Sequence, residues 1–291
     1  MTKSRFKYLK AEDIRKLNSY EFAPKLIAEG YLAGRHISHI KGVSTEFRDY
    51  RQYLPGDDIS LLDWKVFART DRHFVKTFNQ ETNTSCYIFL DSSASMGFGE
   101  KISKLEYASF FTAALSYLVT KGSNQVSLQL FDEKIKSYIP LGNSSKHLQN
   151  ILNLLERNSP GSQTNLGEAL RRSYPLLKQR GTLVVISDFL DDPGNIFASL
   201  SQYLHAGHKV FLFHVLDPEE VELPKDKLTR FIDMETNSKV TVHTDTIRDE
   251  YKRLMQQNIE LLRELSVRKK IEYTVVRSDT NYFTLFDKLV K

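Results

Sequence analysis

The stretch Ser85-Cys-Tyr-Ile-Phe-Leu-Asp91 decides the fold class, because it is a short apolar run that ends on a carboxylate. After it, apolar runs short enough to be buried strands alternate with longer segments of helical period. This alternation is typical of a parallel sheet that is covered by helices on both faces. The sequence therefore predicts a mostly parallel α/β domain over residues 81–291.

The individual elements of this domain follow from the same two periods. Buried strands are predicted at 85–90, 125–131, 182–187, 209–215 and 271–276, with an edge strand at 134–141. Helices are predicted at 104–121, 146–158, 166–179, 195–205 and 246–269. The last helix has the clearest apolar stripe, formed by Ile247, Tyr251, Leu254, Leu261 and Leu265. Residues 231–243 predict a hairpin that turns at Asn237 and Ser238.

The first 80 residues do not show the strand and helix alternation of the rest of the chain. A single amphipathic helix is predicted at 11–29, and a polar segment rich in aromatic and charged residues follows it up to a β-like run at 74–78. We interpret residues 1–80 as a smaller α+β region beside the main domain.

Composition excludes several classes of protein. The 41 basic and 36 acidic residues are spread along the 291-residue chain, and no basic stripe with interleaved aromatics predicts a nucleic-acid surface. The single cysteine, Cys86, allows neither an internal disulfide nor a cysteine-based zinc site, and its apolar neighbours predict an inert core thiol. No run of about 18 apolar residues predicts a membrane span. These features lead us to expect a cytoplasmic protein.

The loop after the first strand carries the candidate chemistry. Asp91, Ser93 and Ser95 alternate along it, and Gly97 is expected to allow the tight backbone that turns all three toward one centre. In an open α/β sheet, loops at the carboxyl ends of the strands form the binding crevice. Oxygen ligands of this kind suit a hard cation, Mg²⁺ first and Mn²⁺ next. Ser-Ser-Ala-Ser taken alone is more often an ordinary polar turn between strand and helix.

Two later segments supply further oxygen donors at the same edge of the predicted sheet. Thr164 precedes a predicted helix, and Asp188 follows the buried strand 182–187. The order of these features resembles the metal-ion-dependent adhesion site of von Willebrand factor A domains. That resemblance implies a Rossmann-like central sheet flanked by helices. It also implies that the hydroxyls of Ser93, Ser95 and Thr164 contact the metal directly or through water, while Asp91 and Asp188 act largely through bound waters.

Such a site predicts protein binding and not catalysis. Two carboxylates against one divalent cation give a formally neutral site, and mostly neutral hydroxyl ligands leave the metal electrophilic. An acidic side chain of a partner protein can then complete the octahedron, and the contact should vanish with a chelator.

A second motif lies upstream, in Glu46-Phe-Arg-Asp-Tyr-Arg-Gln-Tyr-Leu-Pro-Gly-Asp-Asp-Ile-Ser-Leu-Leu-Asp-Trp-Lys-Val-Phe-Ala-Arg69. It resembles the hallmark of the bacterial proteins grouped as domain of unknown function 58, in which Arg-x-Tyr-x-x-Gly-Asp-Asp leads to Asp-Trp and Ala-Arg. Ser60 departs from that pattern, where a basic residue is expected. The resemblance implies a partner, a MoxR-type AAA+ ATPase, for which such proteins are thought to act as adaptors in assembling or maturing other proteins.

The charged side chains of this motif have two possible roles. They could form ion pairs that hold the N-terminal region against the main domain, or they could form a surface for a partner. Trp64 is expected to be an anchor in the internal interface. The charged residues concerned are Arg48, Arg51, Asp57, Asp58, Asp63 and Arg69.

Two other functions compete with metal-dependent protein binding. A Mg²⁺-dependent phosphohydrolase could also use carboxylates at strand ends, but the haloacid-dehalogenase pattern needs a second Asp where this chain has Ser93. Residues 160–164 lack the Gly-Lys pair of a Walker loop. RNA binding is the weaker rival, since some A-type domains occur in ribonucleoproteins.

Overall fold

The computed structural model describes residues 6–18, 45–53, 62–80, 84–223, 228–232 and 239–290. The chain divides into two compact units: one is formed by residues 36–83, and the other by residues 1–35 together with 84–291. The two units are described separately below.

The larger unit is built on a six-stranded sheet with the order β10-β7-β6-β3-β4-β5. Its strands are β3 (Ser85–Asp91), β4 (Gln125–Phe131), β5 (Ile135–Gly142), β6 (Gly181–Ser187), β7 (Lys209–Leu216) and β10 (Glu272–Arg277). All neighbouring strands pair in parallel except β5, which runs antiparallel to β4 at the edge. The predicted mostly parallel α/β domain is confirmed, including the edge strand predicted at 134–141, whose antiparallel direction the sequence did not predict.

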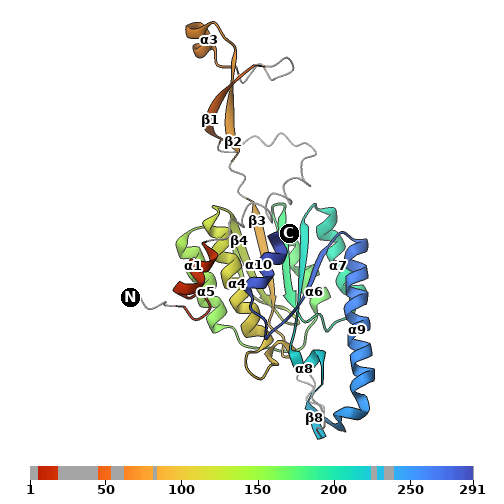
Figure 1. Ribbon diagram of the computed structural model, residues 1–291. Coiled ribbons are helices and arrows are strands. Elements are labelled where there is room, and N and C mark those ends of the chain that lie inside the picture. The colour runs from red at the N-terminus through yellow and green to blue at the C-terminus, as the bar shows by residue number, and fades with distance from the viewer. Residues whose placement is uncertain are drawn as a thin grey trace. The chain divides into compact units, whose positions relative to one another are not determined.

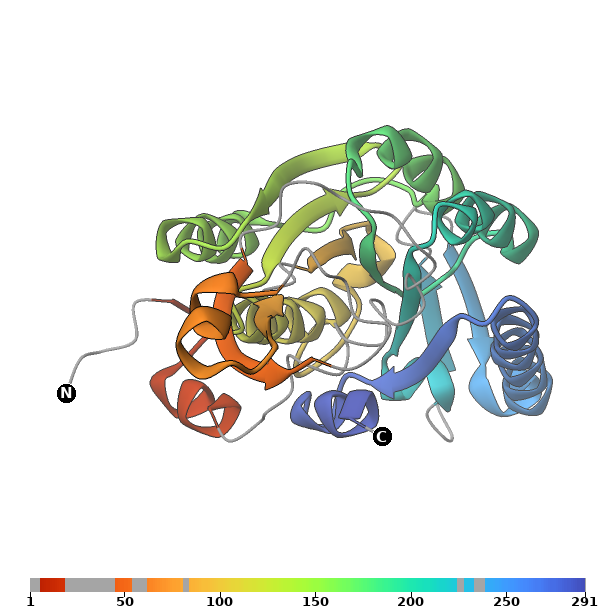
Figure 2. The same cartoon turned by 90° about the horizontal axis from the view of Figure 1, so that it is seen from above.

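Helices cover both faces of this sheet. They are α1 (Ala11–Leu17), α4 (Lys104–Lys121), α5 (Ser145–Arg157), α6 (Leu166–Ser173), α7 (Pro193–His205), α8 (Pro218–Val221), α9 (Thr244–Arg268) and α10 (Phe283–Val290). One core cluster joins the sheet to α1, α4, α5 and α10, and a second joins its other face to α6, α7 and α9 (Figures 1 and 2). Cys86 lies in the first cluster, where burial raises the pKa of its thiol to about 12, so the thiol stays protonated.

Two of the predicted helices differ in detail from the structure. The helix predicted to reach residue 179 ends at Ser173 and continues only as the 3-10 turn Tyr174–Leu176, because Pro175 has no N–H to extend the α-helical bonding. On α9, Leu254 and Leu261 of the predicted apolar stripe are 52% and 46% exposed. At this turn of α9, the residue that enters the core is the neighbouring Leu262, which is fully buried, so the buried face of the helix differs from the predicted stripe.

The N-terminal segment packs on the larger unit. Tyr8, Leu9 and Leu17 are buried in the same core cluster as α4, and Tyr117 on α4 donates a hydrogen bond to Asn18 Oδ1 at 2.9 Å. The structure thus divides the chain differently from the predicted boundary between residues 80 and 81, because these apolar side chains find their partners on α4. The predicted helix 11–29 is described only as far as Leu17, since residues 19–44 lie outside the described part of the chain.

The described residues of the smaller unit form a two-stranded antiparallel sheet and the helix α3. Strand β1 (Thr45–Gln52) pairs with β2 (Phe74–Gln80), and α3 (Trp64–Thr70) precedes β2 in the chain. Asp63 caps α3, since its carboxylate accepts the N–H groups of Lys65 and Val66 at 2.9 and 3.3 Å.

The larger unit also carries the predicted hairpin. Strands β8 (Leu228–Ile232) and β9 (Lys239–His243) pair antiparallel just before α9, which confirms the hairpin, while its predicted turn at 237–238 lies outside the described residues. Among the residues that the structure describes, no helix combines the length and apolarity needed to cross a membrane.

Candidate metal site

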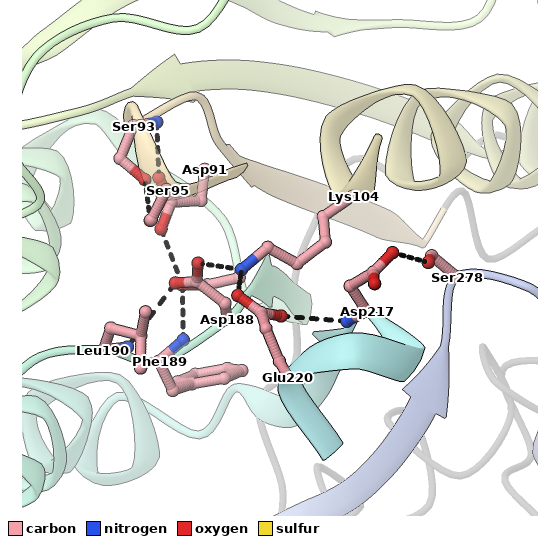
Figure 3. Close-up of polar contacts among 11 residues, drawn as sticks. Asp91, Ser93, Ser95, Lys104, Asp188, Phe189, Leu190, Asp217, Glu220 and Ser278 are labelled. Atoms are coloured by element: carbon pink, nitrogen blue, oxygen red, sulfur yellow. Dashed lines mark hydrogen bonds and ion pairs between the residues drawn. The ribbon is translucent and has the colours of Figure 1, made fainter. Parts of the chain in front are cut away.

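The loop that follows β3 folds its oxygen atoms around a buried carboxylate. Asp91 is fully buried; its Oδ1 accepts the Ser93 N–H at 2.8 Å and its Oδ2 accepts the Ser187 hydroxyl at 2.6 Å (Figure 3). The hydroxyl oxygens of Ser93 and Ser95 lie 3.1 Å apart. The structure therefore brings together the three residues that were predicted from their alternate spacing.

The segment that carries Thr164 is joined to this loop by backbone hydrogen bonds. The N–H of Gly161 donates to Ser92 O at 2.7 Å, and the N–H of Ala94 donates to Ser162 O at 2.9 Å. Any side chain at Gly161 would meet Asp132, because a Cβ there would lie 2.3 Å from its Oδ2. Thr164 itself is half-buried next to Asn165, which caps α6.

Asp188 is placed beside Asp91 by the pairing of their strands. Strands β3 and β6 are parallel neighbours with Leu90 opposite Ile186, so both strands reach the same edge of the sheet. Asp91 is the last residue of β3 and Asp188 directly follows β6, and both carboxylates are buried. Ser187 links Asp91 to the turn that carries Asp188, because its hydroxyl donates to Asp91 and accepts the N–H of Phe189 at 2.9 Å. Phe189 has φ = 50°, an uncommon value for a bulky residue, which marks a tightly determined turn directly after Asp188.

Lys104 is a member of this cluster that the sequence did not predict. Its ammonium lies 2.7 Å from Asp188 Oδ2 and 2.5 Å from Glu220 Oε1, and its side chain is fully buried (Figure 3). Burial opposes its charge, but the two carboxylates outweigh burial and hold the pKa of Lys104 above its ordinary value. Lys104 is the first residue of α4, directly after the cap Ser103, a place where lysine is usually solvated, so the sequence contained no signal for its burial.

Burial and neighbouring charge shape the titration of the site. Burial, and then the charge of Asp188, raise the pKa of Asp91 to about 7, although hydrogen bonds from Ser187 and Ser93 act in the opposite direction. His214 on β7 is also fully buried, and burial lowers its pKa to about 4; its Nδ1 lies 2.6 Å from Tyr273 Oη. The site thus holds a neutral histidine and a carboxylate that resists ionisation.

The described residues contain no group of three or more His, Cys, Asp and Glu placed to hold a metal. A metal site here therefore depends on the serine and threonine hydroxyls together with the carboxylates. This donor chemistry is the one that the sequence predicted.

The sequence led us to expect that Gly97 gives the loop its backbone freedom. In the structure, Gly99 has this role. Gly99 has φ = 139°, whereas Gly97 closes the 3-10 turn Ser95–Gly97 without a positive φ. A Cβ at Gly99 would lie 2.4 Å from Ile102 O. Gly99 thus allows the chain to pass from Ser95 to the start of α4.

Replacing Gly99 should loosen this connection. We expect Gly99→Ala to lower the free energy of unfolding by about 1–3 kcal/mol, because it adds both backbone strain and a clash with a carbonyl. Urea denaturation followed by circular dichroism would measure the change, with Gly97→Ala as the matched control. Equal effects of the two substitutions would contradict the assignment of the strained position to Gly99.

The upstream motif is only partly described. Arg48 and Arg51 lie on β1, Asp63 caps α3, and Arg69 is exposed on α3, while Asp57 and Asp58 lie outside the described residues. Trp64 is 61% exposed on the smaller unit and meets Phe67 edge to face, with ring centroids 6.2 Å apart. Its predicted role as an anchor against the main domain stays a prediction.

Comparison with known proteins identifies the family. The family described as "Protein of unknown function DUF58" matches residues 49–261. The chain belongs to this family. Uncharacterized protein Rv1480 of Mycobacterium tuberculosis is 31% identical over 215 residues, which cover 72% of this chain and 66% of that protein. Uncharacterized protein YeaD of Bacillus subtilis is 24% identical over 144 residues, covering 49% of this chain and 34% of that one. The chain thus spans just under two thirds of the length of its curated mycobacterial relative.

Solved structures resemble the chain at the level of fold. The conserved hypothetical protein BatB from Bacteroides thetaiotaomicron superposes with a TM-score of 0.51 at 18% identity, covering 71% of this chain and 97% of that one. The VWA domain of SpRpn10 matches with a TM-score of 0.42 at 11% identity, covering 72% of this chain and 94% of that domain. The DUF58 chain shares its fold with BatB, and the predicted Rossmann-like, mostly parallel sheet flanked by helices is confirmed.

Proposed function

We propose that this protein is a non-catalytic protein-binding module that uses a divalent cation, Mg²⁺ or Mn²⁺, held by the Asp91 loop. The observation that carries the proposal is the paired hydroxyls of Ser93 and Ser95, 3.1 Å apart beside the buried carboxylate of Asp91. Hydroxyl and carboxylate oxygens are ligands that hard cations prefer. Asp188 and Thr164 would complete the set from the two adjoining loops.

The electrostatics of the site supports a cation. Asp91 and Asp188 are both fully buried, and burial, followed by the charge of Asp188, raises the pKa of Asp91 to about 7. A bound cation would relieve the repulsion between the two carboxylates and favour the ionised form. Neutral hydroxyl ligands leave such a cation able to accept one more oxygen, which an Asp or Glu of a partner protein would supply.

The partner we propose is a MoxR-type AAA+ ATPase, for which this protein would be an adaptor in the assembly or maturation of other proteins. This part of the proposal rests on the Arg-x-Tyr-x-x-Gly-Asp-Asp motif of residues 51–58 and on membership of the DUF58 family. The client protein would offer its acidic side chain to the metal.

A phosphohydrolase is the alternative function. It would need a nucleophilic carboxylate open to substrate, whereas both oxygens of Asp91 accept hydrogen bonds, from Ser93 and Ser187. The position two residues after Asp91 is Ser93, so the general acid of the dehalogenase pattern has no counterpart there. These contacts favour the binding module.

The decisive experiment compares metal and hydroxyl dependence together. The wild type and Ser93→Ala/Ser95→Ala would be immobilised, exposed to native lysate with Mg²⁺ or EDTA, and the retained proteins identified by mass spectrometry. We expect an AAA+ ATPase or an acidic client to be retained only by the wild type with Mg²⁺. The control Ser123→Ala/Ser145→Ala removes two exposed hydroxyls near the opposite, amino edge of the sheet and should behave like the wild type.

Two results would contradict the proposal. Retention of the same proteins in EDTA, or by the Ser93/Ser95 variant, would show that the metal does not form the contact. Phosphatase turnover that Asp91→Asn abolishes would support the hydrolase instead.

A further inference from the structure

A buried lysine stands between the candidate metal site and α8. Lys104 contacts Asp188 Oδ2 at 2.7 Å and Glu220 Oε1 at 2.5 Å, and 17% of the Glu220 side chain is exposed. Figure 3 shows the Lys104 side chain extending from the start of α4 toward both carboxylates. The three charges therefore form one chain that begins at a proposed metal residue.

The second carboxylate of this chain is itself held in place. Glu220 on α8 accepts the N–H of Asp217 at 2.9 Å through Oε2, which leaves Oε1 for Lys104. Asp217 in turn caps α8 and accepts the Ser278 hydroxyl at 3.0 Å, so α8 is fixed to the ends of β7 and β10. Glu220 is thus positioned by the fold and is not a mobile surface acid.

Holding α8 against α4 does not by itself require the charged pair Lys104 and Glu220. Buried ion pairs are expensive to desolvate, and well-packed apolar side chains of similar size often stabilise a protein equally well. The pair costs the protein desolvation, yet it adds one positive and one negative charge directly behind Asp188. Its distinctive effect is on the electrostatic potential at the site.

We infer that Lys104 offsets the charge of Glu220 and so keeps the net charge of the site at the minus two that Asp91 and Asp188 provide, which favours a divalent cation; this inference rests on the proposed metal-dependent function. The carboxylates of Asp91, Asp188 and Glu220 carry three negative formal charges, and Lys104 carries one positive charge. The net charge of minus two matches one divalent ion. In a buried environment of low effective dielectric constant, a mismatch of one unit charge strongly changes ion affinity.

Three variants change this charge in a defined way. Lys104→Met raises the negative charge to three, Glu220→Gln lowers it to one, and the double variant restores two. The double variant removes both members of the pair and leaves Asp188 as the one carboxylate that has lost its contact with the ammonium. In Glu220→Gln, the amide oxygen can still accept the Asp217 N–H that Glu220 Oε2 accepts in the wild type.

The experiment measures the affinities of each variant for Mg²⁺ and for the trivalent ion Tb³⁺, by titration calorimetry and Tb³⁺ luminescence. We expect Lys104→Met to raise the preference for Tb³⁺ over Mg²⁺ by about tenfold or more, which corresponds to 1.4 kcal/mol. We expect Glu220→Gln to weaken Mg²⁺ binding by about tenfold. The double variant should return to within about threefold of the wild-type preference.

Matched control substitutions are available next to α4 and α8. Lys101→Met and Glu222→Gln make the same chemical changes at exposed positions close in sequence to Lys104 and Glu220, and should leave the ion preference unchanged. Circular dichroism and thermal unfolding would confirm that each variant is folded. If Lys104→Met does not fold, the comparison of Glu220→Gln with the double variant still decides the question.

The possible failures are distinguishable. A wild type that binds neither ion overturns the proposed function, and the inference with it. A wild type that binds Mg²⁺, with variants that keep its ion preference, overturns only the inference and leaves Lys104 as a structural ion pair.

Discussion

Lys104→Met is expected to lower the free energy of unfolding of the metal-free protein by about 3–5 kcal/mol. The substitution removes the ammonium that contacts Asp188 and Glu220, so two carboxylates in a buried cluster lose their counter-charge. Leaving a charge buried without its partner is among the most destabilising changes known. For a domain of this size, such a loss corresponds to a decrease in Tm of roughly 10 °C.

Chemical denaturation in EDTA would measure this loss, and a second titration with saturating Mg²⁺ should recover part of it, because the ion replaces the missing positive charge. Lys101→Met is the control; its side chain is exposed, and its effect should stay within about 0.5 kcal/mol. A Lys104→Met protein as stable as the wild type in EDTA would show that the ion pair contributes nothing to the fold.

Asp91→Asn should have the opposite effect and stabilise the metal-free protein. At alkaline pH, the wild type must keep Asp91 ionised while it is buried beside Asp188, which is why the pKa of Asp91 is raised to about 7 from 3.8. Asparagine keeps an oxygen that can accept the Ser93 N–H but carries no charge. We expect a gain on the order of 2–4 kcal/mol in EDTA at pH 8, together with loss of Mg²⁺ binding.

The pH dependence of this gain follows from the direction of the shift. An acid whose pKa is higher in the folded state starts to destabilise the fold once pH rises above the unfolded pKa, and the cost is complete once pH exceeds the folded pKa. The advantage of Asp91→Asn should therefore be full above about pH 8 and should shrink toward pH 4. Urea titrations of both proteins across this range would measure it. A variant less stable than the wild type at pH 8 would show that the hydrogen bonds of Asp91 outweigh its charge.

The sheet was predictable because each buried strand is a continuous apolar run with turn residues on both sides. Residues 85–91 and 209–216, for example, are buried along almost their whole length. The candidate site was predictable for a related reason: carboxyl ends of parallel strands meet at one edge, so Asp91 and Asp188 had to lie close together.

The features of the site that could not be predicted from the sequence depend on contacts with other residues that local patterns do not reveal. Lys104 and Glu220 are 116 residues apart in the chain, and neither differs in local pattern from an exposed residue at the start of a helix. Ser187 precedes Asp188 as an unremarkable strand end, yet its hydroxyl joins the two acidic loops. The role of Gly99 depends on a carbonyl three residues away, which periodicity does not reveal.

The packing of residues 6–18 on α4 affects how the nascent chain folds during translation. The segment leaves the ribosome while α4 is still about 100 codons from completion, which takes roughly 5–20 s at 5–20 residues per second. Until then Tyr8, Leu9 and Leu17 have no apolar surface to cover them, although all three are buried in the finished protein. Residues 36–83 are translated during this interval, so the smaller unit is complete before the larger one can close. A nascent chain that stalls before residue 104 would expose these side chains and become a substrate for chaperones.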